Sequence, residues 1–152
     1  MAEHDVEYEY EPSGAPSISS GASSYEDGNA VAAAFDELGA TLIACTSVAG
    51  TDAEGNSWDF SLTTDETLAT DTIDDQINVT AVGTLTDTAG NEYELTLHQS
   101  YVRIGKNVIT VGVTDVSDAA DLQTGYTAIA IDRLVSVIID SEPSETTGPQ
   151  PA

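Results

Sequence analysis

Acidic and amide side chains in two loops have the types and spacing that could bind a hard cation. The candidate calcium ligands are Asp52, Glu54, Asn56, Asp71, Asp74 and Asp75. Calcium prefers carboxylate and amide oxygens, but neither loop matches the 12-residue calcium loop, because Gly55 precedes Asn56 and no glutamate closes the loop. We therefore interpret these residues as turn-forming and solvated, with no bound cofactor, and keep weak calcium binding as the alternative.

Few side chains could support catalysis. A Ser-His-Asp triad would have to use His98, since the other histidine, His4, lies in a segment without periodicity. Cys45 could act as a thiol nucleophile beside His98, but it lies on an apolar helical stripe with no cation nearby to lower the thiol pKa. No phosphate-binding glycine loop, CxxC or HExxH motif occurs. We predict that the protein is not an enzyme, with a hydrolase built on His98 as a remote alternative.

The net charge limits the classes of partner. Twenty-seven Asp and Glu face three basic residues, Arg103, Lys106 and Arg133, for a net charge of −24. Such a surface repels nucleic acid and anionic lipid and attracts cations. No run of about 18 apolar residues occurs, so we predict no direct insertion into a membrane. The expected partner is an unknown protein or a small-molecule ligand.

Composition divides the chain into three parts. Residues 1–27 contain acids, no base and a Ser/Gly/Pro/Ala stretch, which predicts a disordered acidic arm. Residues 141–152 are rich in proline and polar residues, which predicts a disordered tail. The predicted domain is therefore 28–140. Cys45 is the single cysteine, so an intrachain disulfide cannot stabilise it.

Two helices and an antiparallel sheet are predicted within the domain. An apolar stripe at helical spacing starts after a candidate cap at Asn29 and comprises Val31, Phe35, Leu38, Leu42 and Cys45. Alternating strands follow, two of them after similar turns at 51–56 and 86–91. A second helix, capped by Ser117 or Asp118, has an apolar stripe of Leu122, Tyr126, Ile129, Arg133 or Leu134, and Val137. The predicted fold is α+β, a five-stranded antiparallel sheet with an N-terminal and a C-terminal helix packed on it.

The candidate ligand-binding residues are aromatic. Trp58, Tyr93 and Tyr101 lie on or next to predicted strands, where aromatic side chains on the solvent face could anchor a cationic partner.

Three segments resemble a known group of domains. They are the helix from Ala33-Ala34-Phe35 to Thr46-Ser47, the strands 101–111 and the helix ending Ala130-Ile131-Asp132-Arg133-Leu134. Over residues 28–140 this pattern resembles actinobacterial extracellular sensor domains, namely the PknH-type receptor-kinase ectodomain and related envelope lipoproteins, which have a PsbP-like sandwich. The resemblance implies an extracytoplasmic binding or sensing module without catalytic residues. Unlike the kinase ectodomains, this chain has no cysteine pairs.

We expect a non-enzymatic extracytoplasmic binding or sensing domain, located extracellularly or in the cell envelope. The alternative is a structural surface protein of a halophile, a cell envelope or a virus particle, and the alternative location is the cytoplasm of a halophile. A halophile's acidity would spread over the whole surface, whereas acidity that serves a cationic partner would concentrate on one face.

Overall fold

A computed structural model describes residues 2–9, 17–115 and 120–141. Within these ranges, two helices and seven strands follow one another along the chain. They are β1 (Ala2–Glu9), β2 (Ser17–Ser24), α1 (Gly28–Ala44), β3 (Ser47–Thr51), β4 (Ser57–Asp65), β5 (Asp75–Thr86), β6 (Glu92–Ile104), β7 (Asn107–Asp115) and α2 (Ala120–Ser141). The predicted α+β class is confirmed.

The strands form one antiparallel sheet in the order β1-β2-β7-β6-β5-β4-β3. The prediction of a five-stranded sheet was wrong, because β1 and β2 extend it beyond the strands that lie between the helices. β2 pairs with β7 along its whole length, from Ser17 opposite Thr114 to Ser24 opposite Asn107. An uncovered β7 would present a row of unpaired backbone groups, and β2 satisfies them.

The two added strands come from segment 1–27, for which we predicted a disordered arm. Where the structure describes that segment, at 2–9 and 17–24, it is sheet. Composition missed β2 because its small polar residues carry no apolar alternation, and its pairing depends on backbone hydrogen bonds to a strand almost ninety residues away. Of the predicted tail 141–152, residues 142–152 lie outside the described ranges, as does the predicted α2 cap at Ser117 or Asp118.

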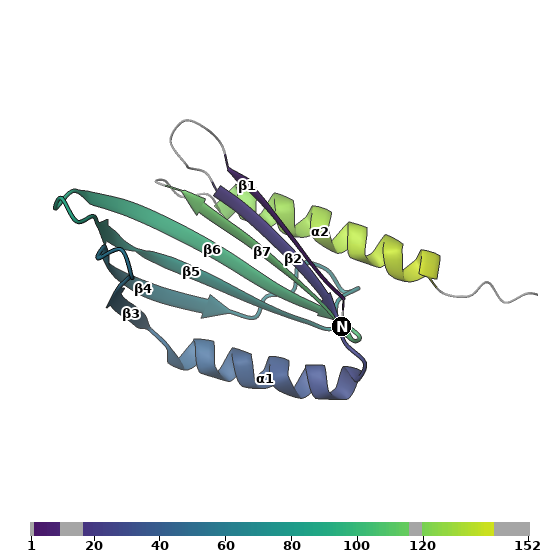
Figure 1. Ribbon diagram of the computed structural model, residues 1–152. Helices are drawn as coiled ribbons and strands as arrows, with labels where there is room; N and C mark the ends of the chain where they lie inside the picture. The colour runs from purple at the N-terminus through teal and green to yellow at the C-terminus, as the bar shows by residue number, and fades with distance from the viewer. Residues whose placement is uncertain (1, 10–16, 116–119, 142–152) are drawn as a thin grey trace, which may run out of the picture.

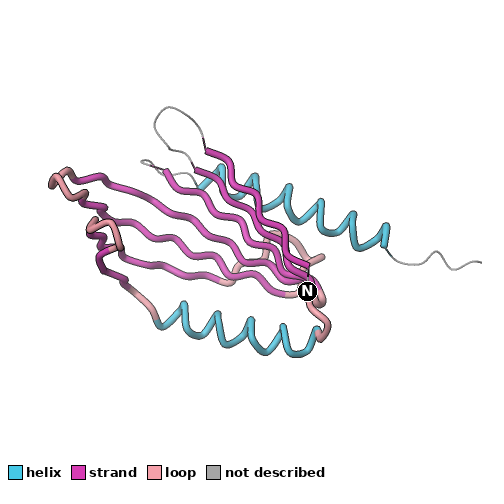
Figure 2. Tube along the Cα trace, in the orientation of Figure 1, coloured by secondary structure: helices cyan, strands magenta, loops and turns pink. Residues whose placement is uncertain are grey.

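The helices cover opposite faces of the sheet, so the molecule has three layers (Figures 1 and 2). Two neighbouring residues on β6 face different helices. Tyr101 packs against the core beneath α1, which contains Phe35 and Ile77, whereas Val102 belongs to the core beneath α2 with Ile131. Successive side chains of a strand point to opposite faces, so the sheet separates two hydrophobic cores.

The predicted apolar stripe of α1 is the face that packs on the sheet. Val31, Phe35 and Gly39 are buried, and Leu38 and Leu42 pack beside the core beneath α1. The helix is capped by Asp27, not by Asn29 as predicted: Asp27 Oδ1 accepts hydrogen bonds from the Asn29 and Ala30 N–H groups at 2.9 and 3.2 Å. A cap side chain accepts from N–H groups two and three residues later, which places the cap at Asp27.

The stripe predicted for α2 was wrong except at Leu134, the alternative to Arg133, which packs beside the core beneath α2. The buried face is Gln123, Thr127 and Ile131. The residues of the predicted stripe that stay exposed are Leu122, Tyr126, Ile129, Arg133 and Val137. Two of the three buried side chains are polar, so a search for apolar spacing selected another face. α2 is also the one described helix that is long and apolar enough to cross a membrane, by length and composition alone, a criterion that core helices of soluble proteins also meet.

Candidate functional site

The predicted aromatic candidates do not form one site. Trp58 and Tyr93 are both registered with Leu85, at one end of the sheet. Tyr93 is exposed, and its hydroxyl lies 3.3 Å from Asp87 Oδ2 in the adjacent turn. Tyr101 lies eight residues farther along β6, about 27 Å away at the rise of an extended strand. Among these described residues, Tyr101 lines a cavity of about 640 Å³, whose lining includes neither Trp58 nor Tyr93.

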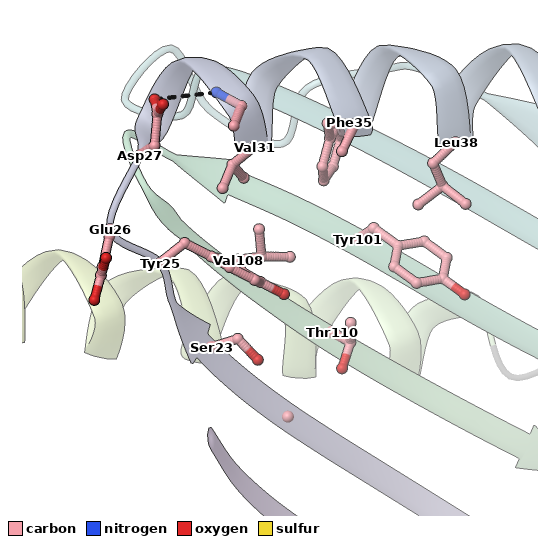
Figure 3. A pocket seen from close by; sticks show the side chains of 13 residues that line it. Ser23, Tyr25, Glu26, Asp27, Val31, Phe35, Leu38, Tyr101, Val108 and Thr110 are labelled. Carbon is pink, nitrogen blue, oxygen red and sulfur yellow. Dashed lines mark hydrogen bonds between the residues drawn. The ribbon is translucent and has the colours of Figure 1, made fainter. Parts of the chain in front are cut away.

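That cavity is a groove of about 640 Å³ between α1 and the strands β2, β7 and β6. We call it the α1 groove. It is lined by Gly21, Ser23, Tyr25, Glu26, Asp27, Ala30, Val31, Ala34, Phe35, Leu38, Tyr101, Val108 and Thr110. Figure 3 shows Val31, Phe35 and Leu38 pointing from the helix toward Tyr101, Val108 and Thr110 on the strands.

The groove exists because α1 covers only part of its face of the sheet. The helix packs toward β5 and β4, where Phe35 meets Ile77 and Val79, and Thr64 Oγ1 donates to the Leu42 carbonyl at 3.3 Å. On the other side of the helix, β2 contributes only Gly21 and Ser23 to the lining. Residues this small cannot fill the space beside a helix, so a hollow remains.

The groove is apolar along its length and acidic at one end. The side chains of Val31, Phe35, Leu38 and Val108 form apolar walls. Glu26 and Asp27 lie at the start of α1 and make this end of the groove acidic, although the Asp27 carboxylate also caps the helix (Figure 3). None of the described residues that line the groove is basic. Burial raises the pKa of the Tyr101 phenol, which lines the groove from β6.

The acidic cluster proposed for calcium is partly occupied by an arginine. Arg103 Nε donates to Asp75 Oδ2 at 2.6 Å, and Arg103 Nη1 lies 3.4 Å from Asp74 Oδ2. The Gly105 N–H also donates to Asp74 Oδ2, at 2.6 Å. Asp71 lies apart from this pair and has a 3.5 Å contact with Thr70 Oγ1. The guanidinium occupies the position from which a cation would have to bind Asp74 and Asp75 together.

The other candidate loop is a hairpin turn closed by its own side chains. Asp52 accepts hydrogen bonds from the Asn56 N–H at 2.8 Å and from Asn56 Nδ2 at 2.9 Å, and Glu54 is exposed. The 86–91 turn repeats this arrangement, with Asp87 accepting from Asn91 at 2.8 and 2.7 Å. These hydrogen bonds, chiefly those from the asparagine side chains, lower the pKa of Asp52 and Asp87. Among the described residues, no three His, Cys, Asp or Glu side chains are grouped to hold a metal ion.

The candidate catalytic side chains lie on opposite faces of the sheet. His98 is buried on the α2 face, with Nδ1 3.1 Å from Thr80 Oγ1. Cys45 follows the last turn of α1, and its thiol donates to the Ser47 carbonyl at 3.6 Å. The imidazole therefore lies across the sheet from α1, and the structure does not bring together the two residues of the thiol–histidine alternative.

Most of the α1 groove could not be found from the sequence. Tyr101 was a candidate, but Gly21, Ser23 and Tyr25 belong to the segment predicted to be disordered. The available signal was weak: a Ser/Gly/Ala run before a capped helix fits a strand that carries small side chains, but it fits a linker equally well. No protein-family model, curated protein or solved structure matches this chain.

Proposed function

We propose that this chain is a non-enzymatic binding domain whose α1 groove accepts a small molecule with an apolar body and a positively charged end. The observation that carries the proposal is the groove itself, about 640 Å³ of mostly apolar space that ends at Glu26 and Asp27. Ligand pockets of this size are mostly apolar, with a few polar groups that orient the ligand.

The negative charge of the protein supports a positively charged ligand. A net charge of −24 raises the local concentration of cations around the molecule, and two carboxylates lie at one end of the groove. An anionic head group would meet Glu26 and Asp27 without a neutralising base in the lining. Recognition would therefore combine apolar burial along the helix with attraction at its first turn.

Binding of matched amphiphiles tests this function. Decyltrimethylammonium, a neutral decyl glucoside and decyl sulfate, all below micelle formation, would compete against Nile red fluorescence. We expect the cation to bind most tightly and the sulfate least. Equal affinity for the three would contradict the charge argument. If none of them displaced Nile red, the groove would not be a binding site for such molecules.

Two pairs of variants locate the binding. Ala34→Phe should fill the groove and weaken binding at least about tenfold, whereas Ala40→Phe is the control, since Ala40 is an exposed α1 residue outside the lining. Glu26→Gln should weaken only the cation, by about threefold, as expected for a solvent-exposed charge pair. Its control is Glu37→Gln, also exposed on α1 and outside the lining.

The location that we propose is extracellular or in the cell envelope, with the cytoplasm of a halophile as the alternative. Its support is the resemblance to sensor domains and the acidic composition. A sensing role would require that a ligand in the α1 groove alter the contacts of this chain with a neighbouring domain or protein.

A structural surface protein is the second candidate, and the observation that favours it is α2. Its outward side chains include Leu122, Tyr126, Ile129 and Val137, which are 41, 39, 55 and 64% exposed. Apolar side chains aligned on one helix face suit contact with another copy of the chain. Sedimentation at low and high NaCl tests this: assembly that Ile129→Lys abolishes supports it, and a monomer at both salt concentrations contradicts it.

A further inference from the structure

The two edge strands of the described sheet differ in how they are protected against pairing with another chain. β1 and β3 are the outermost strands (Figure 1). β1 has an acidic residue at every second position, Glu3, Asp5, Glu7 and Glu9, and charges on an edge strand oppose its pairing with a second copy. β3 has the sequence Ser-Val-Ala-Gly-Thr, without a charge or a proline, and it pairs with β4 without a bulge. β3 is therefore the unprotected edge.

The register with β4 decides which backbone groups of β3 point outward. The Leu62 N–H donates to the Thr46 carbonyl and the Asp52 N–H to the Asn56 carbonyl, both at 2.9 Å. Hydrogen-bonded and non-bonded pairs alternate along an antiparallel ladder, so the even-numbered residues of β3 bond to β4. The residues whose N–H and carbonyl groups point away from β4 are Ser47, Ala49 and Thr51.

The sequence of β3 is complementary to itself. When two copies of the strand pair antiparallel about Ala49, Ser47 of one copy lies opposite Thr51 of the other, and Val48 lies opposite Gly50. Hydroxyl side chains form favourable cross-strand pairs. The residues with outward backbone groups then form the hydrogen-bonded pairs of the new ladder. A large side chain also meets a position without one.

The position without a side chain lies under an aromatic ring. A Cβ at Gly50 would lie 2.6 Å from Trp58 Cζ2, so the indole lies over Gly50. Val48 is on the same face of β3 and is 38% exposed. In the paired arrangement, Val48 of the second copy lies opposite Gly50 and beside this indole. Each copy therefore contributes one valine and one tryptophan to apolar contacts across the edge.

The net charge of −24 opposes self-association, but β3 lies in a neutral part of the chain. Residues 38–51 contain no charged side chain, although 20% of the whole chain is charged. Asp59 lies opposite Ala49 on β4. In the paired arrangement the two copies of Asp59 would be three strand spacings apart, about 14 Å. This separation exceeds the Debye length of about 8 Å at physiological ionic strength, so salt screens their repulsion.

We propose that two copies of this chain pair antiparallel along β3, centred on Ala49, so that their sheets join into one. The interface uses neither the α1 groove, whose lining contains no β3 residue, nor the exposed face of α2.

Sedimentation velocity of the whole chain at low and high NaCl, up to millimolar protein, tests the pairing. We expect a monomer–dimer equilibrium that shifts toward the dimer as NaCl rises. Ala49→Pro removes an N–H that points away from β4, and edge strands accept proline at such positions. The variant should keep its fold and weaken the dimer at least about tenfold. Its control is Ala53→Pro, at an exposed position in the following turn, which should leave dimerisation unchanged.

Disulfide cross-linking tests the register. In a Cys45→Ser background, Ala49→Cys places two thiols opposite each other, with Cα atoms about 5.5 Å apart, within the range that a disulfide spans. Oxidised glutathione should link this variant into a covalent dimer. Ser61→Cys in the same background is the control, because Ser61 is exposed on β4, inward of the edge, and this variant should stay monomeric.

Four results would overturn the proposal. The first is a chain that stays monomeric at millimolar concentration and high salt. The second is a dimer that Ile129→Lys dissociates and Ala49→Pro leaves intact, because association would then use α2. The third is equal cross-linking of Ala49→Cys and Ser61→Cys. The fourth is a basic extended peptide that binds to β3 while the chain itself remains monomeric.

Discussion

Arg103 and Asp75 lie directly opposite each other on β6 and β5, and Arg103 Nε donates to Asp75 Oδ2 at 2.6 Å. The arginine side chain is 14% exposed, and its Nη1 also donates to the Gly105 carbonyl at 2.9 Å. One of three basic residues in the chain is therefore held against the acidic cluster and connects β5, β6 and the turn before β7. Its role here is structural, and the cluster is less negative than its sequence indicates.

Replacing this arginine should destabilise the fold. Arg103→Met removes charged hydrogen bonds to Asp74 and Asp75 and should lower the free energy of unfolding by about 2 kcal/mol. Urea denaturation measures the change. Arg133→Met, exposed on α2, is the control and should change stability by less than about 0.5 kcal/mol. Equal effects of the two variants would show that the Arg103 contacts contribute nothing.

The two similar turns at 51–56 and 86–91 should make the free energy of unfolding depend on pH in the acid range. Their hydrogen bonds hold the pKa of Asp52 and Asp87 below the ordinary value of 3.8 in the folded chain. As the pH falls, the unfolded chain therefore binds these protons at a higher pH than the folded chain does. The stability that the turns contribute is complete above pH 3.8 and is lost as the pH falls through the lower pKa values of the folded chain. Asp52→Asn with Asp87→Asn should flatten the dependence of unfolding free energy on pH below about 4.

The matched control for the turns is Asp71→Asn, whose carboxylate has one 3.5 Å contact with a neighbouring hydroxyl. It should leave the acid slope nearly unchanged. A double turn variant with the same acid slope as the wild type would contradict the role given to these hydrogen bonds.

Two glycines should respond in opposite directions to alanine. A Cβ at Gly83 would lie 2.7 Å from Phe60 Cα and closer still to the Asp59 carbonyl, both of them backbone atoms of β4 that cannot move aside. Gly83→Ala should cost about 3 kcal/mol. Gly125 lies within α2 with nothing within 4 Å of the added Cβ, and Gly125→Ala should stabilise by about 1 kcal/mol. Thermal unfolding of both variants checks the signs.

The orientation of α2 can be tested with two isoleucines on different faces. Ile131 is 2% exposed in the core beneath α2, and Ile131→Ala should cost about 3 kcal/mol. Ile129 is 55% exposed, and Ile129→Ala should cost less than about 1 kcal/mol in the monomer. The reverse order would restore the stripe that was predicted from apolar spacing.

Salt should stabilise the protein more than calcium does. A net charge of −24 makes the folded chain repel itself, and NaCl near 1 M screens charges beyond about 3 Å. The melting temperature should rise by several degrees in NaCl. Calcium at equal ionic strength should add no further increase, because Arg103 already binds Asp74 and Asp75. A saturable increase at millimolar calcium that Asp71→Asn removes would instead identify a calcium site.

Local patterns in the sequence determined the structural features that depend only on residues close together in the chain. The spacing from Val31 to Leu42 identified the buried face of α1, and the repeated Asp and Gly-Asn residues identified two hairpin turns. The helix face and the turns both depend on side chains that are a few residues apart, so the local sequence is enough to predict them. The net charge and the α+β class follow in the same way from composition and from the change of period.

Only the tertiary structure decided where the arm lies and which face of α2 is buried. β2 joins the sheet because it pairs with the edge of β7, and the residues of β2 give no sign of that pairing. Gln123 and Thr127 face the sheet because Ser100 and the Val111 carbonyl bind Gln123 Nε2 there. Hydrogen bonds between segments far apart in the chain set both outcomes, and no local pattern of apolar residues predicts them.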